Sequence, residues 1–496
     1  MPVPLSAAWA TLHAVARRTK NARVYLVGGA VRDTMLGRPI RDADLVVKGD
    51  LTTFAAELSR ALRTHTVRVG RDHAAIRLPL ADGDQLDLAP IVTSLEDDLA
   101  RRDFTINTMA VALANVPAAG PEGLNQEFVI DWHGGRADLR NRTIRMTSSG
   151  VFVADPLRMM RAVRLACELE CAVTPTTVAA IRQSAPGLRN VAPDRVGAEL
   201  QRIFASPRAA AGARLLDECG LLDICFPAFV TGRGIEQPPF HRHDVSEHGL
   251  VSAEWMDVLL AEDERGLSEA ARELWRLTWR RASWPVTRWG PLRAHLARRA
   301  TELRLATLLH DIGKPATRTD EPNGRRRFFG HAAAGAALAT EQLRHWRLPT
   351  VLIERVALLI EHHMRPGQAA APGQPPTARA LYRLHQVLGD ATPDACFLFL
   401  ADSLGTAGTD VLVPDWPAYI AHAQEIACWR PPPAAEEVRR LADGNAVMAA
   451  TGLRPGPVVG WLLAAIEEAA AIGDIATPDA ALALANRLAK ESPHAE

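Results

Sequence analysis

Two aspartates separated by one residue, Asp42 and Asp44, follow a glycine pair, Gly28-Gly29, within residues 24–47. Side chains of a β-strand alternate between its faces, so both carboxylates are expected to project from one side of a strand. Adjacent carboxylates repel each other unless a cation lies between them, and ligation by oxygen alone suits Mg²⁺ bound together with phosphates. The spacing therefore predicts a magnesium site beside a glycine turn that can admit a bulky ligand.

A second set of residues with ligand chemistry occurs in the C-terminal half of the chain. In chain order they are His248, the adjacent pair His310-Asp311, His331, His363 and Asp402. A mixture of imidazole and carboxylate ligands suits a divalent transition metal such as Mn²⁺, Ni²⁺ or Co²⁺, with Fe and Zn²⁺ as further candidates. The neighbouring His362 leaves one ligand ambiguous, because either imidazole of the His-His pair could bind the metal.

The elements that must position the two aspartates follow from the periodicity of apolar residues. An apolar run at 24–27 predicts a buried strand, residues 30–36 a helix and residues 42–47 a second strand. Further predicted elements are helices at 5–20 and 54–62 and strands at 66–80 and 85–92. The last strand would carry Asp87, which is either a third carboxylate of the metal site or an ordinary polar strand residue.

The balance of charges leaves most classes of partner open. The chain has 57 basic and 57 acidic residues, so net charge alone predicts no partner. Residues 136–214, however, contain thirteen Arg, no Lys and six Asp or Glu, a local balance of +7, and the forked guanidinium suits phosphate. No run resembles a signal peptide or reaches membrane-spanning length, and the six Cys lack metal-binding spacing. We therefore expect a cytoplasmic protein with no membrane partner.

A row of arginines follows the predicted helix start at Asp155, where Pro156 takes the first helical position. Arg158, Arg161 and Arg164 succeed Asp155 at intervals of three along one edge. Such a row is often a solvated charged face. Beside an acidic metal site, three evenly spaced Arg favour a clamp for a triphosphate.

Four ordered motifs carry a resemblance to a known family. They are Gly28-Gly29-Ala30-Val31-Arg32-Asp33 with Asp42-x-Asp44, Asp98-Leu-x-Arg101-Arg102-Asp103-Phe104-Thr105-x-Asn107, Gly134-Gly135-x-x-Asp138-Leu139 and Asp155-Pro-Leu-Arg158. Over roughly residues 22–230 the chain resembles the class II tRNA nucleotidyltransferase and bacterial poly(A) polymerase family. The resemblance implies an α+β fold, with a polymerase-β-like nucleotidyltransferase head of mixed sheet and helices and then an all-α neck, body and tail.

The resemblance also implies roles by position. Asp42 and Asp44 would be catalytic and hold Mg²⁺, with Asp87 as the candidate third carboxylate. The residues it places on the nucleotide are Gly28, Gly29, Arg32, Arg102, Asp103, Asn107, Arg161 and Arg164. Asp155 and Arg158 would read the base in place of a template. Cytosine fits this pair, because its N4 amino group can donate to a carboxylate and its O2 and N3 can accept from a guanidinium.

The reaction implied by the resemblance is template-independent transfer of a nucleotide to the 3′ end of tRNA. One Mg²⁺ would lower the pKa of the 3′-hydroxyl and another, about 4 Å away, would bridge the triphosphate. The hydroxyl would attack the α-phosphorus in line and pyrophosphate would leave.

Two departures from the family pattern bear on the product. Ala154 stands where the family usually has Glu, which puts the support of Asp155 or Arg158 in doubt. The connection after the Asp87 strand is confined to residues 89–93, whereas relatives that add the whole CCA end have a considerably longer loop. The short connection predicts the CC-adding subtype, which uses CTP, unless it is harmless loop variation.

Other functions remain open from the sequence. The chain could be a complete CCA-adding enzyme that uses CTP and ATP, or a poly(A) polymerase or A-adding enzyme. It could also be an RNA-binding or nucleotide-signalling protein whose head is a relic, although the intact motif residues argue against this.

The histidine and aspartate series of the second half resembles the HD phosphohydrolase superfamily. The resemblance implies a metal pair that activates water against a phosphomonoester or a 2′,3′-cyclic phosphate, such as a damaged tRNA end. A degenerate HD fold serving as a tRNA-binding scaffold is the alternative, but every ligand position is filled.

The predicted domains are a head at 1–140, a helical neck and body that reads the base and binds RNA at 141–235, an HD domain at 236–410 and a tRNA-binding helical tail at 411–496. The segment 262–300 is rich in Arg and contains four tryptophans, namely Trp275, Trp279, Trp284 and Trp289. These rings could stack on RNA bases, but packing between helices is the favoured interpretation.

Overall fold

The computed structural model describes residues 3–19, 22–69, 74–238, 241–281, 286–322, 325–370, 374–408, 415–433, 435–436, 438 and 442–491, with only the backbone at 281 and 286–289. The chain forms two compact units. One contains residues 1–203 with 215–224, and the other contains residues 204–214 with 225–496.

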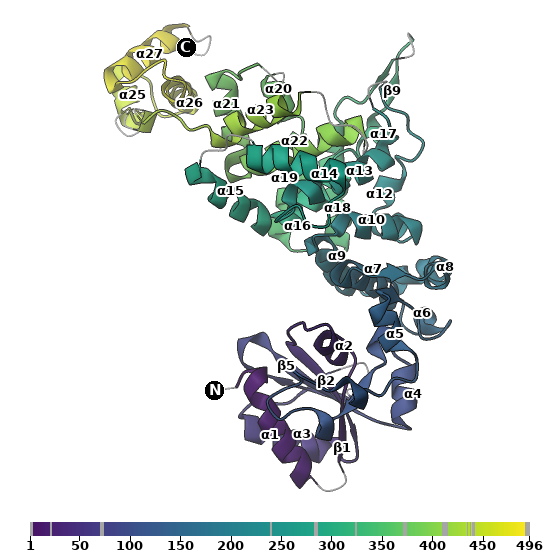
Figure 1. The fold of residues 1–496 in the computed structure, drawn as a ribbon. Helices are drawn as coiled ribbons and strands as arrows, with labels where there is room; N and C mark the ends of the chain where they lie inside the picture. The colour runs from purple at the N-terminus through teal and green to yellow at the C-terminus, as the bar shows by residue number, and fades with distance from the viewer. Residues whose placement is uncertain are drawn as a thin grey trace. The chain divides into compact units, whose positions relative to one another are not determined.

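The first unit begins with a layer of helices on a six-stranded mixed sheet (Figure 1). Its strands are β1 (Arg23–Val27), β2 (Asp42–Lys48), β3 (Val67–Val69), β4 (Ala75–Pro79), β5 (Gln85–Pro90) and β6 (Ala110–Ala112). Its helices are α1 (Leu5–Arg18), α2 (Gly29–Met35), α3 (Leu51–Leu62), α4 (Leu95–Ala100) and α5 (Gly135–Arg140). The strand order is β3-β4-β5-β2-β1-β6, and β2 pairs parallel with β5 and antiparallel with β1.

The central strand β2 explains why the chain folds around the two aspartates. Leu45, Val46 and Val47 are buried, as expected for a strand covered on both faces. In the register of the sheet, Asp44 lies opposite Val27 of β1 on one side and opposite Asp87 of β5 on the other. The sheet therefore brings the end of the glycine turn, the Asp-x-Asp pair and Asp87 to one place.

Element boundaries differ from the predicted ones where caps decide them. Helix α3 starts three residues earlier than predicted, because the Asp50 side chain accepts backbone hydrogen bonds from Thr52 and Thr53 at 3.0 Å each. The single strand predicted at 66–80 is instead the antiparallel pair β3 and β4, and residues 70–73 between them lie outside the described part. Helix α1 and strand β5 each end two residues earlier than predicted.

Helices dominate the chain after the sheet. They are α6 (Val151–Ala154), α7 (Leu157–Leu169), α8 (Pro175–Ser184), α9 (Pro193–Ala205), α10 (Ala209–Glu218), α11 (Leu222–Cys225) and α12 (Pro227–Val230), with the short parallel pair β7 (Thr143–Ile144) and β8 (Ala172–Val173). In α7 the residues Met159, Ala162 and Val163 are fully buried, so this apolar side of the helix is packed against the rest of the unit.

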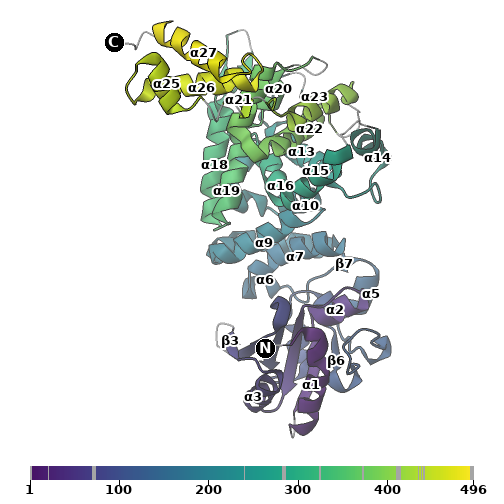
Figure 2. The same cartoon turned by 90° about the vertical axis from the view of Figure 1, so that its left-hand side faces the viewer.

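In the described residues of the second unit, the regular structure is helical apart from the short antiparallel pair β9 (Thr319–Asp320) and β10 (Arg326–Arg327). Its helices are α13 (Val245–Leu260), α14 (Glu269–Arg276), α15 (Val286–Arg298), α16 (Ala300–Leu309), α17 (Lys314–Thr317), α18 (His331–His345), α19 (Thr350–His362), α20 (Arg365–Ala369), α21 (Ala378–Leu388), α22 (Thr392–Ala407), α23 (Trp416–Cys428), α25 (Gly444–Thr451), α26 (Pro457–Ala471) and α27 (Pro478–Glu491). Helices α13, α16, α19 and α22 pack against one another, and α18 packs on α19 (Figure 2). Helices α25 to α27 share a smaller core around Val447, Leu462 and Ile466. The predicted α+β class, with a mixed-sheet head and a helical remainder, is confirmed.

The tryptophan-rich segment packs between helices as far as it is described. Trp275 and Trp279 are buried, and the Arg293 guanidinium lies 5.8 Å and 4.7 Å from their ring centroids. The side chains of Trp284 and Trp289 lie outside the described part. Among the described residues, no helix is long and apolar enough to cross a lipid bilayer.

Candidate functional site

The surroundings of the two aspartates of β2 disfavour the ionised form of their carboxyl groups. Burial raises the pKa of the Asp44 carboxyl, the Asp87 charge adds to this effect, and the Arg102 guanidinium opposes it. Burial and the charge of Asp87 also raise the pKa of Asp42. Carboxylates that share a strand face and resist ionisation are ready to receive a cation. Because all the donors are oxygens, the set fits Mg²⁺.

The third carboxylate, Asp87, lies opposite Asp44 but already has a partner. Its two oxygens accept hydrogen bonds from Nε and Nη2 of Arg77, both at 2.8 Å. Sequence reasoning missed Arg77, because only the register of β4 against β5 shows that this residue faces Asp87. Asp87 contributes negative charge to the site while its own charge is balanced.

The glycine turn explains why Gly28 cannot carry a side chain. Its φ is +71°, and a Cβ atom at this position would lie 2.5 Å from Nη1 of Arg102 and 3.3 Å from Oδ2 of Asp44. The guanidinium of Arg102 therefore occupies the space that the glycine leaves. Asp98 holds it there by accepting hydrogen bonds from Nε at 3.3 Å and Nη2 at 3.2 Å.

A chain of hydrogen bonds connects α2 to α7 through the segment after α4. Arg32 donates from Nη1 to the side-chain oxygen Oδ1 of Asn107 at 2.6 Å, and its Nε and Nη2 donate to the Asp33 carboxylate. Asn107 donates to Oδ1 of Asp103 at 2.9 Å. Asp103 accepts from Nε of Arg161 at 2.8 Å. Burial raises the pKa of Asp103, but Arg161 and Asn107 outweigh it and hold that pKa below its usual value.

Asp44, Arg102, Asp103, Asn107 and Arg161 are among the residues that line a cavity of about 240 Å³. Its lining residues are Gly29, Asp44, Arg102, Asp103, Asn107, Asp155, Leu157, Arg158, Arg161 and Arg195. Nine of these ten residues belong to the motifs or the arginine row, while Arg195 of α9 does not. The cavity therefore gathers residues that lie far apart in sequence.

Asp155 and Arg158 differ in how firmly they are held. The Asp155 carboxylate accepts a hydrogen bond from the backbone N–H of Leu157 at 3.2 Å and one from Nη2 of Arg195 at 3.4 Å. Among the described residues, no hydrogen bond or ion pair is found for the Arg158 guanidinium, which leaves its donors available. Arg195 supports Asp155 in a region where Ala154 offers no polar group. Its only signal in the sequence was its place in the arginine-rich segment.

Arg164 does not reach the cavity. It is 4% exposed and donates to Glu199 and Glu168, each at 2.6 Å. A step of three residues on an α-helix falls 60° short of a full turn, so successive members of the row rotate away from the side occupied by Arg158. Of the three arginines predicted to bind the triphosphate, Arg158 and Arg161 thus line the cavity and Arg164 does not.

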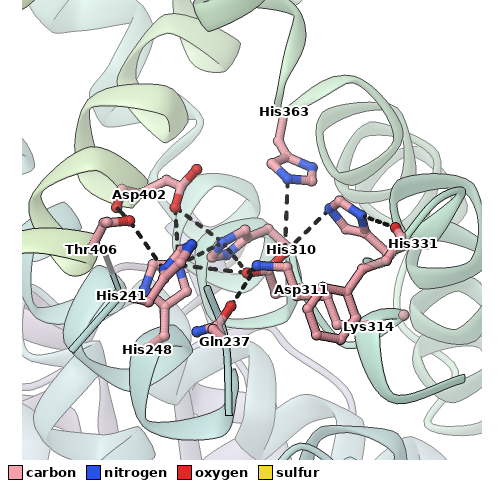
Figure 3. A network of polar contacts seen from close by, with 12 residues as sticks. Gln237, His241, His248, His310, Asp311, Lys314, His331, His363, Asp402 and Thr406 are labelled. Atoms are coloured by element: carbon pink, nitrogen blue, oxygen red, sulfur yellow. Dashed lines mark hydrogen bonds and ion pairs between the residues drawn. The ribbon is translucent and has the colours of Figure 1, made fainter. Parts of the chain in front are cut away.

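The second candidate site lies within the second unit, where Figure 3 shows the imidazoles of His248, His310, His331 and His363 around the carboxylates of Asp311 and Asp402. Nε2 of His248 lies 2.9 Å from Oδ1 of Asp402 and 3.2 Å from Nε2 of His310. Oδ2 of Asp311 lies 3.2 Å from Nε2 of His310, and Oδ1 of Asp311 lies 3.4 Å from Nε2 of His331. Nε2 of His363 is 3.9 Å from Oδ1 of Asp311.

Three of the imidazoles are oriented by backbone carbonyl groups. Nδ1 of His310, His331 and His363 lies 2.8, 2.7 and 2.7 Å from the carbonyl oxygen three residues earlier. A proton on each Nδ1 leaves Nε2 as a lone pair directed inward, which is the orientation of metal-binding histidines. Ligand atoms of His248, His310 and Asp402 lie within 4.8 Å of one another, as do those of His310, Asp311 and His363. The donor set therefore fits a divalent transition metal.

The caps of the helices create this convergence. His310 and His363 are the C-cap residues of α16 and α19, and His331 is the first residue of α18. His363 is buried at 3% exposure and faces the cluster, while His362 lies against Arg365. The geometry therefore favours His363 over His362 as the ligand.

Sequence reasoning missed three residues around this cluster. The Lys314 ammonium lies 2.6 Å from Oδ2 of Asp311 and donates to Oε1 of Gln237 at 2.6 Å. The ring of His241 packs edge-on against His248, and burial together with the Lys314 charge lowers its pKa to about 3. Lys314 was visible in the sequence four residues after His310, but Gln237 and His241 precede the first predicted ligand and carried no signal.

Three segments of the chain match models of known protein families. Residues 24–145 match the family described as "Poly A polymerase head domain", residues 172–231 match "Probable RNA and SrmB- binding site of polymerase A", and residues 291–407 match "HD domain". The A-adding tRNA nucleotidyltransferase of Deinococcus radiodurans is 35% identical over 94% of this chain and 96% of its own length. The chain belongs to the CCA-adding tRNA nucleotidyltransferase family.

Other relatives of this family member differ in product. The CC-adding tRNA nucleotidyltransferase of Thermus thermophilus is 33% identical over 92% of each chain. The solved CCA-adding enzyme of Thermotoga maritima in complex with tRNA shares the fold, with a TM-score of 0.59 at 19% identity over 98% of this chain and 95% of that chain. The predicted family is confirmed: the chain is a tRNA nucleotidyltransferase with an HD domain, and both domain types depend on divalent metals.

Proposed function

We propose that this nucleotidyltransferase adds two cytidylate residues from CTP to the 3′ end of tRNA and then stops. In each cycle the tRNA 3′-hydroxyl oxygen forms a bond to the α-phosphorus, the bond to pyrophosphate breaks, and the hydroxyl proton passes to solvent. Asp42 and Asp44 would hold Mg²⁺, which supplies a lowered hydroxyl pKa and neutralises triphosphate charge. Arg102 and Arg161 supply charge-assisted hydrogen bonds to the phosphates.

Base choice is assigned to Asp155 and Arg158. The carboxylate accepts from the N4 amino group of cytosine and the guanidinium donates to N3 and O2. Two donors, the backbone N–H of Leu157 and Arg195, fix the Asp155 carboxylate before the nucleotide arrives, which lowers the cost of ordering it on binding. Uracil presents an acceptor at the position of the amino group and is disfavoured by an unpaired carboxylate.

The observation that carries the CC-only proposal is the connection between β5 and α4, which is residues 91–94. The Ile91 N–H donates to the Val47 carbonyl at 2.9 Å, so this residue still belongs to the sheet. Ser94 caps α4, and the side chain of Thr93 also bonds to Asp97. Among these four described residues, only Val92 makes no such hydrogen bond to the sheet or to α4. The connection therefore provides no segment that could reshape the base site for a purine.

The relatives favour a second candidate, addition of the terminal adenylate alone, because one of them is named as an A-adding enzyme. Two transcripts of one tRNA separate the candidates, one lacking CCA and one ending in CC, each offered CTP, ATP or both. The proposal expects two cytidylates on the first transcript and no growth on the second. Adenylation of the second transcript would contradict it.

We further propose that the HD site hydrolyses phosphomonoester or 2′,3′-cyclic phosphate ends of RNA. His248, His310, Asp311, His331, His363 and Asp402 would hold a divalent metal pair that supplies an activated water. In the cyclic case a water oxygen bonds to phosphorus, one ring P–O bond breaks, and the leaving oxygen takes the proton. The Nε2 atoms directed into the cluster favour this proposal over the alternative of a tRNA-binding scaffold, because a scaffold does not require imidazoles oriented as metal ligands.

The test of this second activity uses a transcript ending in a 2′,3′-cyclic phosphate, incubated with Mn²⁺, Ni²⁺ or Co²⁺ in turn. The proposal expects ring opening by the wild type and none by His310→Ala. A wild-type protein that leaves the cyclic end intact with all three metals would contradict it.

A further inference from the structure

A large cavity adjoins the HD cluster on the side of the hairpin β9–β10. Its volume is about 920 Å³, well above that of the nucleotidyltransferase cavity. His331, Lys314 and His241 belong both to its lining and to the network in Figure 3. A substrate in this cavity would therefore touch the proposed metal site.

The wall of the cavity is basic. Lys314, Arg325, Arg326 and Arg327 line it, and no carboxylate is found among its described lining residues. The carboxylates that pair with three of these cations are outside the lining: Lys314 pairs with Asp311 at 2.6 Å, Arg326 pairs with Glu236 at 2.7 Å, and Arg327 pairs with Glu321. A wall with this charge fits a ligand with more than one phosphate.

An aromatic side chain at the same wall is largely exposed. Phe329 is 73% exposed, and the guanidinium of Arg327 lies 5.2 Å from its centroid. The neighbouring Phe328 is buried beneath the Lys314 ammonium at 5.8 Å. Phe328 therefore packs and Phe329 presents its ring. Exposed rings beside arginines are the arrangement that stacks unpaired bases.

We propose that Arg325, Arg326, Arg327 and Phe329 bind the 3′-terminal nucleotides of an RNA whose end carries a phosphate. Phe329 stacks on the terminal base, the arginines contact the backbone phosphates, and the end phosphate reaches the HD cluster past Lys314 and His331. This inference rests on the proposed phosphohydrolase function and adds the residues that would bind the single-stranded RNA end next to the HD cluster.

The test compares binding of two fluorescent RNA trinucleotides, one ending in a 2′,3′-cyclic phosphate and one in a 3′-hydroxyl, to full-length protein in EDTA. The wild type is expected to prefer the cyclic phosphate. Phe329→Ala should weaken binding of the cyclic-phosphate trinucleotide at least about fivefold, since stacking on one aromatic ring contributes on the order of 1 kcal/mol or more per base. Phe329→Trp should retain the wild-type affinity. The control is Phe128→Ala, which removes an exposed phenylalanine of the other unit, at 47% exposure.

Two further measurements separate the inference from the function on which it rests. Arg325→Ala should lower the slope of log affinity against log salt by about 0.7, as for one lost phosphate contact on a single strand. With the metal restored, Phe329→Ala should slow hydrolysis of the trinucleotide while hydrolysis of glycerol 2-phosphate stays unchanged. Unchanged affinity of Phe329→Ala for the cyclic-phosphate trinucleotide overturns the inference, whereas wild-type protein that hydrolyses neither substrate overturns only the phosphohydrolase function.

Discussion

At the scale of single residues, Asp44, which we propose as a metal ligand, is a carboxyl group whose ionisation destabilises the folded protein. Burial raises its pKa, so the folded state disfavours the carboxylate. That penalty is absent below the unfolded pKa near 3.8 and grows as the pH rises through the folded pKa. A cation bound between Asp42 and Asp44 would remove the penalty.

Asp44→Asn is therefore expected to separate stability from activity. Without divalent ions at neutral pH, the variant should unfold at a temperature equal to or above that of the wild type. Added Mg²⁺ should raise the unfolding temperature of the wild type only. Extension of a tRNA lacking CCA should fall roughly a thousandfold, because metal contributes several kcal/mol to the transition state.

Asp82→Asn provides the matched control for that substitution. Asp82 is an exposed head residue with a φ of +59°, a conformation that asparagine tolerates. Extension by this control should equal the wild type. An Asp44→Asn enzyme that extends tRNA normally would remove the β2 aspartates from the mechanism.

Asp155 should decide which pyrimidine is used. Asp155→Asn replaces one acceptor oxygen with a donor amide, which can pair with O4 of uracil but repels the amino group of cytosine. The preference for CTP over UTP should fall by about 10- to 100-fold, equivalent to about 1–3 kcal/mol for a bidentate contact. Competition between labelled CTP and UTP measures it, and an unchanged ratio would show that another residue reads the base.

The adjacent histidines offer an internal control for the second site. His363→Ala should abolish the increase in unfolding temperature caused by Mn²⁺ or Ni²⁺, because its inward Nε2 is lost. His362→Ala should keep that increase, since His362 faces Arg365. The opposite result would assign the ligand to His362.

At the scale of elements, the chain Arg32–Asn107–Asp103–Arg161 fixes α2 and α7 to the segment after α4. Each member satisfies a buried polar group of the next, so loss of one leaves its neighbour unpaired. Because the pKa of Asp103 is held below its usual value, its stabilisation exists above pH 3.8 and disappears as the pH falls through the folded pKa.

Asn107→Ala should therefore destabilise the protein by about 1–3 kcal/mol and raise the KM for CTP. Asn141→Ala changes an exposed asparagine of the same region and should leave both quantities unchanged. Urea unfolding and initial rates of extension measure the two effects. Equal stability of both variants would mean that the connection between α2 and α7 does not depend on Asn107.

At the scale of the whole molecule, the two sites lie in separate compact units with no residue in common. Asp42→Ala should abolish extension and leave hydrolysis of cyclic phosphate ends intact, and His310→Ala should do the reverse. Loss of both activities in either variant, with the fold preserved by circular dichroism, would show that the units act together.

The sequence alone determined the family and the α+β class, and it singled out most of the residues that the structure gathers at the two candidate sites, because each depends on local order. Asp-x-Asp alternation and the glycine turn both act within a few residues of the chain. The adjacent His310 and Asp311 likewise mark a cluster from sequence alone.

The tertiary structure decided the partners that come from distant segments. The sheet register places Arg77 opposite Asp87, and the packing of α9 brings Arg195 to Asp155. The rotation along α7 directs Arg164 toward Glu168 and Glu199. The largely exposed side chain of Phe329 is also visible only in the folded chain. Such pairings depend on packing between elements, and the periodicity of a single element carries no information about which neighbour its charged side will meet.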